Sequence, residues 1–221
     1  MTTTLESLHQ VPYLASLDEA LAMELTHSLV KRSLDRGQIL LLEEQPCAGL
    51  FMILQGRIKI FKVSPQGREQ ALHFLGPGDA FNEVAVLDGG PNPASAMATT
   101  SATVWGLARE PLLNLIARHP PLAQSVIAHL ASRTRHLVSL VEDLSFRTVL
   151  SRLAHLLLQE LGSTSRAPQH WTHQEMASRL GTSREVVSRA LGQMEVMGLL
   201  SRERHQLIIL DRDALQRLAL G

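Results

Sequence analysis

The sequence of 221 residues contains a single cysteine, Cys47. One thiol cannot form an internal disulfide, and it cannot supply the ligands of a four-thiolate zinc or iron–sulfur site within one chain. No run approaches the roughly 18 apolar residues that span a membrane, and the first residues lack a basic stretch followed by an apolar one. These absences exclude an iron–sulfur cluster held by one chain and predict a cytoplasmic protein without a membrane segment.

An excess of charge of one sign is also missing, because 21 basic residues balance 21 acidic ones. The chain therefore has no global field that would draw it to nucleic acid. The sequence contains no Walker loop, no His-Glu-x-x-His and no Gly-x-Ser-x-Gly motif. A metal-dependent β-roll enzyme needs several converging histidines, and His73 is the only histidine between residues 38 and 118. We expect no enzymatic activity.

The first half of the chain changes from helical to strand-like patterning. Residues 5–35 carry leucines at helical spacing, which predicts N-terminal helices. Strand-length runs separated by Gly and Pro turns follow at residues 38–42, 49–54, 57–63, 70–75, 95–100 and 103–107. Run 57–63 alternates apolar and polar residues as a half-buried strand does. The pattern predicts an antiparallel, jelly-roll-like β-roll over about residues 37–108.

A long helix is predicted after Pro120 and Pro121. Its apolar residues recur every seven positions along three heptads, which would leave a long apolar stripe exposed on a monomer. This pattern favours pairing with the same helix of a second copy, although burial against its own roll is the alternative. We expect a homodimer. The expected interface residues are Val126, Leu130, Leu137, Leu140 and Leu144.

Residues 172–189 have the pattern of two short helices separated by Gly181, with Thr182 or Ser183 able to cap the second. Each helix has an apolar face at helical spacing. Arginine can bind guanine O6 and N7, and glutamate can accept from cytosine N4, so the start of the second helix is typical of a major-groove reading element. The polar set on it is Arg184, Glu185, Ser188 and Arg189. Exposed charges of this kind also suit a plain solvated surface.

The flanking residues favour DNA recognition. A helix over 147–161, the helix pair, two short strands within 198–210 and a last helix capped by Asp211 together make a winged helix. We therefore predict an α+β protein with a sensor β-roll and N-terminal helices (1–118), a dimerisation helix and hinge (119–145), and a winged helix-turn-helix domain (146–221). Double-stranded DNA is the expected partner. The expected DNA-binding residues are Thr172, His173, Thr182, Ser183, Arg184, Glu185, Ser188 and Arg189.

This order of parts resembles the bacterial Crp/Fnr superfamily of transcription regulators. The stretches Gly78-Asp-Ala-Phe-Asn-Glu83 and Thr182-Ser-Arg-Glu-Val-Val-Ser-Arg189 carry the resemblance, which covers nearly the whole chain. It implies a dimer that reads an inverted repeat with TGTGA-like half-sites and that acts with RNA polymerase. It also implies base contacts by Arg184, Glu185 and Arg189, a Ser188 shared with the oxygen-responsive branch, and a hinge at residues 143–146.

The sensor pocket departs from the pattern of cyclic-AMP-binding members. Those members have Gly-Glu, Arg-Ser and Thr-Ser pairs where this chain reads Asn82-Glu83, Pro93-Ala94 and Leu137-Val138, so only Glu83 is retained. A buried phosphodiester without the arginine would lack a compensating cation. We therefore expect control by neither cyclic AMP nor cyclic GMP.

Two alternatives remain for the pocket. The stretch Gly90-Pro-Asn-Pro93 resembles nitric-oxide-responsive, haem-binding members, which makes haem an alternative cofactor with His73 and His9 as candidate ligands. The haem-ligand positions of carbon-monoxide-sensing members read Asn82 and Val84 instead. Alternatively, the roll is filled by its own side chains and takes no effector. A β-roll interaction protein without DNA binding is a more remote alternative.

Overall fold

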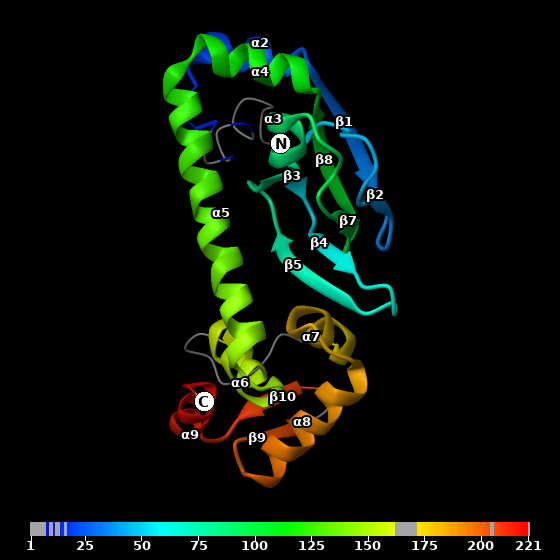
Figure 1. Cartoon of the computed structure of the whole chain (residues 1–221), viewed down its shortest axis with the longest axis vertical. Helices are drawn as coiled ribbons and strands as arrows, with labels where there is room; N and C mark the ends of the chain where they lie inside the picture. Colours follow the sequence, from blue (N-terminus) through cyan, green and yellow to red (C-terminus); the bar gives the residue numbers. More distant parts are fainter. Residues whose placement is uncertain are drawn as a thin grey trace. The chain divides into compact units, whose positions relative to one another are not determined.

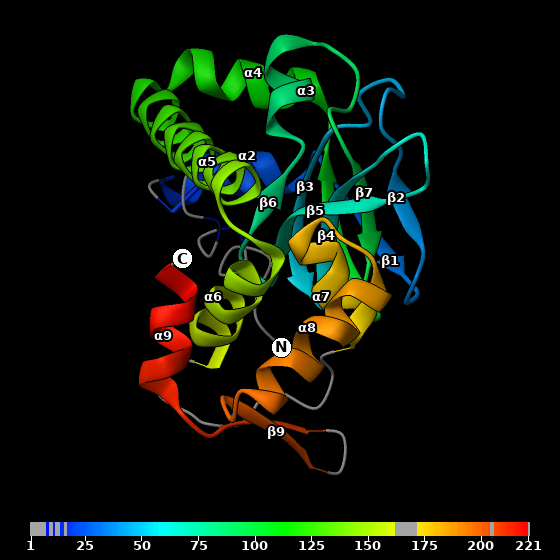
Figure 2. The same ribbon diagram turned by 60° about the horizontal axis from the view of Figure 1, so that its bottom comes forward.

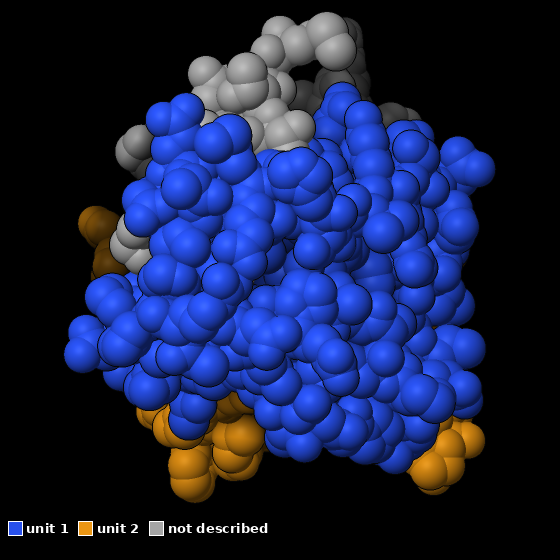
Figure 3. All heavy atoms as spheres, turned by 90° about the horizontal axis from the view of Figure 1, so that it is seen from above, with its two compact units in different colours: residues 1–62, 72–136 blue, residues 63–71, 137–221 orange. Residues whose placement is uncertain are grey.

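The computed structural model of the protein describes residues 8, 11, 14–15, 17–161, 172–203 and 206–220. The chain divides into two compact units (Figure 3). One contains residues 1–62 and 72–136, and the other contains residues 63–71 and 137–221. Among the described residues, no helix has the length and apolar character that a membrane crossing needs.

The first unit is built on two four-stranded sheets, ordered β1-β8-β3-β6 and β2-β7-β4-β5 (Figure 1). The pairings β1–β8, β3–β8, β3–β6, β2–β7 and β4–β7 are antiparallel. This confirms the predicted antiparallel roll. The strands are β1 (Leu29–Leu34), β2 (Ile39–Leu41), β3 (Leu50–Gln55), β4 (Ile58–Val63), β5 (Glu69–Leu75), β6 (Ala80–Phe81), β7 (Ser95–Ala98) and β8 (Ala102–Leu107).

Apolar side chains from both sheets form one core of the roll. The rings of Phe51 and Phe81 stack within this cluster with centroids 5.5 Å apart. Gly106 lies under Phe51, where an added Cβ would approach the Phe51 ring to 3.2 Å. A larger residue at position 106 would therefore displace the ring, because packed cores leave little free volume.

Two local predictions for this unit are wrong. Residues 29–34 are not helical but form strand β1, which pairs with β8 along its full length. Backbone pairing at the sheet edge thus overrides the leucine spacing. Strand β4 does not alternate cleanly either, because Lys59 is buried beside Ile58. Its ammonium lies 4.6 Å from the centroid of the Phe61 ring, so its alkyl stem is covered while the charge meets an aromatic face.

Helices precede, interrupt and follow the strands of the roll. Their bounds are α2 (Glu19–Thr26), α3 (Glu83–Asp88), α4 (Arg109–Arg118) and α5 (Pro120–Phe146). Leu122 and Val126 of α5 are buried in the same cluster as Leu112 and Leu115 of α4. The first part of α5 therefore folds as part of the roll's core. The predicted long helix after the proline pair is confirmed, whereas the short α3 and β6 lacked a distinctive sequence pattern.

The second unit contains the winged helix (Figure 2). Its elements are the end of α5 with α6 (Val149–Leu161), α7 (His173–Leu180), α8 (Arg184–Val196), β9 (Leu200–Glu203), β10 (Gln206–Ile209) and α9 (Arg212–Leu220). Strands β9 and β10 form an antiparallel hairpin. The Asp211 carboxylate accepts a hydrogen bond of 2.8 Å from Ala214 N, which caps α9 as predicted. Residues 163–168, predicted as a loop, lie outside the described residues.

Candidate nucleic-acid interface and sensor pocket

Side-chain caps define the starts of the two helices of the helix-turn-helix. Thr172 Oγ1 accepts a hydrogen bond of 3.1 Å from Glu175 N at the start of α7. Ser183 Oγ accepts one of 3.4 Å from Val186 N at the start of α8, so Ser183 and not Thr182 is the cap. Between them Gly181 has φ of 63°, a left-handed conformation that costs glycine little. The predicted break at this glycine is confirmed.

Helix α8 has a buried face and a polar face. Val187, Ala190, Leu191 and Met194 are buried in the core of the second unit. The four residues expected to read DNA are all exposed, at spacings of one, three and one residue. Residues at such spacing share one side of a helix. The set is Arg184, Glu185, Ser188 and Arg189. The first two turns of α8 thus present two guanidinium groups, a carboxylate and a hydroxyl to solvent.

The neighbouring groups set the charge of Glu185 and His173, which determines the hydrogen bonds that each can form. A hydrogen bond from its own backbone N–H and one from the Ser183 hydroxyl lower the pKa of Glu185, aided by Arg184 and Arg189 and opposed by desolvation. The carboxylate is therefore a charged acceptor near neutral pH. At the start of α7, burial, Arg202 and Arg184 lower the pKa of His173. His173 is thus neutral near pH 7 and suits a hydrogen bond rather than an ion pair.

The wing is attached to α8 by an ion pair. Arg202 Nε of β9 donates to Glu195 Oε2 at 3.0 Å, and Arg202 N donates to Glu195 Oε1 at 3.3 Å. The hydrogen bond from Arg202 also lowers the pKa of Glu195. Because the two residues share two contacts, the pair fixes both the position and the orientation of β9 relative to α8. Sequence patterning did not single out this pair, because the two residues lie in different elements.

The apolar stripe on α5 divides between two faces. Val126 is only 6% exposed and packs into its own roll, and Arg133 of the same seam donates from Nη2 to Ala80 O at 2.8 Å. The expectation that Val126 lies at the dimer interface is therefore corrected: this seam faces the roll. Leu130 and Leu140 are half-buried. Ile127, Val138 and Val141 are exposed on the adjacent face, about 60–120° around the helix from Val126. Leu137 and Leu144 project in nearly the same direction as Val126 and are exposed farther along the helix.

A buried amide network surrounds Asn82, one of the residues expected in the sensor pocket. Asn82 adopts a left-handed conformation, and its Nδ2 donates to Gly49 O at 2.9 Å and to Asn92 Oδ1 at 3.0 Å. Asn92 is 1% exposed, and its own Nδ2 donates to Leu42 O at 3.1 Å. Of the expected pocket pair, Ala94 is buried and Pro93 is exposed. Asn92 is thus a buried partner of Asn82 that the sequence did not predict.

The carboxylate of Glu83 contacts the side chain of His129 in the same chain. Its Oε1 lies 3.1 Å from Nε2 of His129 on α5, and both side chains are largely buried. Arg133 Nε also approaches His129 Nε2, at 3.3 Å. A ring nitrogen either carries a hydrogen or accepts one, so the Glu83 contact is a hydrogen bond when a proton sits between the two groups. Neither His129 nor Arg133 was predicted as a partner of Glu83.

The candidate haem ligand His73 is engaged with α5. Its ring stacks on that of His136 with centroids 4.6 Å apart, and His136 Nε2 lies 3.2 Å from Leu72 O. Burial, with Arg133, His136 and His129 nearby, lowers the pKa of His73 to about 4. The second candidate, His9, lies outside the described residues. The predicted pocket residues Leu137 and Val138 are exposed along α5.

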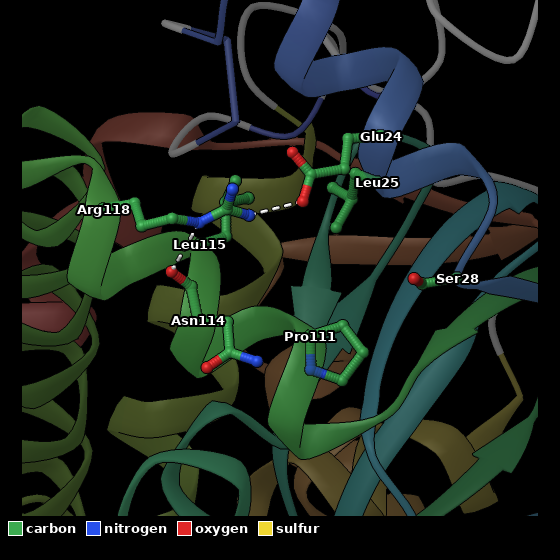
Figure 4. Close-up of a pocket in the computed structure, with 7 residues that line it drawn as sticks. All are labelled: Glu24, Leu25, Ser28, Pro111, Asn114, Leu115 and Arg118. Carbon is green, nitrogen blue, oxygen red and sulfur yellow. Dashed lines mark hydrogen bonds and ion pairs between the residues drawn. The ribbon is translucent and has the colours of Figure 1, made fainter.

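A separate cleft of about 230 Å³ lies between α2 and α4 (Figure 4). An ion pair between Glu24 and Arg118 crosses it, and the hydrogen bond from Arg118 lowers the pKa of Glu24. Arg118 Nε also donates to Asn114 O at 3.3 Å. The cleft is smaller than usual ligand pockets and its charges neutralise each other, so it is a weaker candidate than the surfaces above.

Comparisons with known proteins agree with this arrangement. Residues 31–119 match the family model described as cyclic nucleotide-binding domain, and residues 151–218 match the one described as Crp-like helix-turn-helix domain. The chain is 32% identical over 202 residues to the CRP-like cAMP-activated global transcriptional regulator of Mycobacterium tuberculosis, covering 88% of this chain and 90% of that protein.

Two further proteins show the same likeness. The chain is 37% identical over 142 residues to the cyclic AMP receptor protein of Thermus thermophilus, covering 64% of this chain and 66% of that one. A solved structure from Eubacterium rectale, titled as a regulator of the crp/fnr family, superposes with a TM-score of 0.80 at 24% identity. That match covers 96% of this chain and 99% of the other, and it shows a shared fold.

Proposed function

Because this chain belongs to the Crp/Fnr family of DNA-binding transcription regulators, we propose that it binds, as a homodimer, an inverted repeat with TGTGA-like half-sites. In this proposal it acts with RNA polymerase and is not controlled by cyclic AMP. Two-fold symmetric dimers of this kind place two recognition helices in successive major grooves. The observation that carries the proposal is the polar face of α8, where Arg184, Glu185, Ser188 and Arg189 are all exposed.

Arg189→Ala tests the readout of sequence. Arginine bound to a guanine edge discriminates against wrong bases by about 1–3 kcal/mol. We expect the variant to bind a TGTGA palindrome at least about tenfold more weakly, in line with that range, while binding to a random duplex changes little. Fluorescence anisotropy at one fixed salt concentration measures both. Arg217→Ala on the exposed surface of α9 is the matched control for the loss of one charge. Equal losses on the two duplexes would contradict the proposed base contact.

The proposed independence from cyclic nucleotides differs from what the names of the two relatives indicate. The Mycobacterium tuberculosis relative is named as cAMP-activated, and the Thermus thermophilus relative is named a cyclic AMP receptor. In this chain the retained Glu83 already faces His129. The position expected to supply the phosphate cation is Pro93, which has no donor and is exposed. The contact between Glu83 and His129 of the protein itself supports a regulator that needs no effector.

Isothermal titration calorimetry with cyclic AMP and cyclic GMP tests this independence. We expect no micromolar binding to the wild type and no gain in operator affinity with either nucleotide. The double variant Pro93→Arg with Ala94→Ser restores the Arg-Ser pair of the cyclic-AMP-binding pattern and serves as the matched positive variant. We expect it to gain measurable affinity, because a guanidinium binds a phosphodiester strongly. Micromolar binding to the wild type, coupled to tighter operator binding, would overturn this part of the proposal.

A further inference from the structure

Arg152 of α6 contacts the carboxyl ends of two other helices in the second unit. Its Nη2 donates to Leu180 O, the last residue of α7, at 3.0 Å. Its Nη1 lies 3.4 Å from the carbonyl oxygens of Asp143 and Leu144 near the end of α5, and 3.4 Å from Arg147 O just beyond it. A cation placed at helix carboxyl ends is stabilised by the carbonyls that have no partner within their own helix.

The α7 contact lies directly before the reading helix. Leu180 is followed by Gly181, then by Thr182 and by Ser183, which caps α8. The Thr182 amide donates back to Ala177 O at 3.0 Å, so the turn has a fixed conformation. The base-reading residues begin at Arg184. A displacement of Leu180 O is therefore passed to α8 through a short, hydrogen-bonded turn.

The end of α5 also contacts this turn through packing. A Cβ built on Gly181 would lie 3.3 Å from Leu144 Cδ2, so the Leu144 side chain sits against the glycine. The turn thus meets α5 through an apolar contact and through the guanidinium of Arg152. Two independent contacts between the same segments limit the ways in which one can move without the other.

The geometry requires arginine rather than a generic cation. A guanidinium spreads five donors over three nitrogens and can reach carbonyls of separate helices, whereas a lysine ammonium has its three donors on one nitrogen. Arg152 Nε is buried and has no hydrogen-bond acceptor among the described residues. A buried donor without an acceptor is unfavourable, so the contacts made by the other two nitrogens must offset it. Burial lowers the pKa of Arg152 from its ordinary value, and Asp143 opposes that shift.

We propose that Arg152 is the positioning residue that couples the end of α5 to the reading helix α8. The proposal rests on the proposed DNA-binding function and adds the contact through which a change in α5 reaches the helix-turn-helix. Any ligand that binds the two arrangements of α5 with different affinity would shift the equilibrium between DNA-competent and incompetent dimers. Removing the guanidinium should uncouple the two segments while leaving the reading residues intact.

Arg152→Lys tests the coupling, because it retains the charge and most of the stem. We expect operator affinity to fall by at least about fivefold, the low end of typical coupling effects, with less than a twofold change on a random duplex of equal length. Arg147→Lys is the matched control, because Arg147 Nε pairs with Asp143 Oδ1 of α5 at 2.9 Å and its Nη1 donates to Ala219 O of α9 at 2.8 Å, and both contacts lie outside α7. We expect Arg147→Lys to retain operator affinity within about twofold, because its contacts do not reach α7.

A double-variant cycle with Leu144→Ala separates coupling from general stability. If Arg152 transmits the position of α5, the loss in the double variant is smaller than the product of the two single losses by at least about threefold. Independent losses that multiply would overturn the proposal, as would equal effects of Arg152→Lys on both duplexes or an equal effect of Arg147→Lys. Thermal midpoints of all variants show whether each one folds.

Amide hydrogen exchange gives a readout that needs no DNA. Arg152→Lys should raise exchange at Thr182 and at the end of α5 without raising it in β9 and β10. Uniformly faster exchange throughout the second unit, or no increase in exchange at Thr182, would contradict the coupling. If the wild type does not prefer the TGTGA palindrome, the proposed function fails, and the exchange pattern still decides the role of Arg152.

Discussion

His73 shows how a single side chain is tuned by the elements around it. Its ring lies against His136, with Arg133 and His129 of the same helix close by. Burial first, and then the coulombic effect of Arg133 and the two histidines, disfavours the imidazolium, which lowers the pKa of His73 from 6.5 to about 4. The folded protein therefore holds a neutral imidazole at a pH where an unfolded chain would already be protonated.

This difference predicts a dependence of stability on pH. Above pH 6.5 His73 is neutral in both states, whereas between about pH 6.5 and 4 only the unfolded chain takes up the proton. The free energy of unfolding should thus fall with decreasing pH, by up to about 1.4 kcal/mol per pH unit for one proton. We expect a smaller slope because the ring is partly exposed to solvent.

Urea unfolding of the wild type and His73→Gln between pH 7.5 and 4.5 measures this effect. The wild type should lose more stability than the variant over this range. His27→Gln, at an exposed histidine of the same unit, controls for the loss of one titrating group. Parallel pH profiles of wild type and His73→Gln would show that His73 is not held neutral by folding.

At the scale of elements, α5 carries a buried and an exposed apolar surface that its sequence combines in one stripe. Val126 and Arg133 face the roll, while Ile127, Val138 and Val141 are each more than 60% exposed. The heptad pattern showed that the helix has more apolar surface than one contact needs. It could not show which seam the roll takes, because that depends on how residues distant in sequence pack. The exposed seam supports the proposed homodimer.

Val141→Glu should separate the proposed dimer. A carboxylate at the centre of an apolar helix contact is buried without a partner, which is strongly unfavourable. We expect sedimentation as a monomer at micromolar concentration and a loss of operator affinity of at least about tenfold, because one half-site then binds alone. The measurement is analytical ultracentrifugation with matched anisotropy titrations.

Ser139→Glu is the control for this variant. Ser139 is also exposed, but it projects about 200° around the helix from Val141, two residues at 100° each. It should leave the assembly unchanged. Dissociation by both variants, or by neither, would mean that the exposed seam of α5 is not the contact between copies.

At the scale of the whole molecule, local patterns predicted the elements well and the pocket poorly. The caps and break around Gly181 depend on neighbouring residues, so the reading helix could be identified from the sequence. The partners of Glu83 could not, since His129 lies 46 positions away and reaches it only when α5 packs on the roll. Likewise the two prolines around Asn92 gave no sign of its burial, whereas its Nδ2 donates to Leu42 O and its Oδ1 accepts from Asn82 Nδ2.

The division of α5 between the two compact units has a consequence for how such a chain can diversify. The residues of α5 up to 136 fold with the roll, and those from 137 fold with the winged helix. A hybrid of two related proteins that took all of α5 from one parent would separate part of the helix from its packing partners. Leu122 and Val126 would lose the core of their own roll, or Leu144 would lose the turn at Gly181 against which it packs. Compatible hybrids should therefore join within the helix, near its middle, rather than at either end.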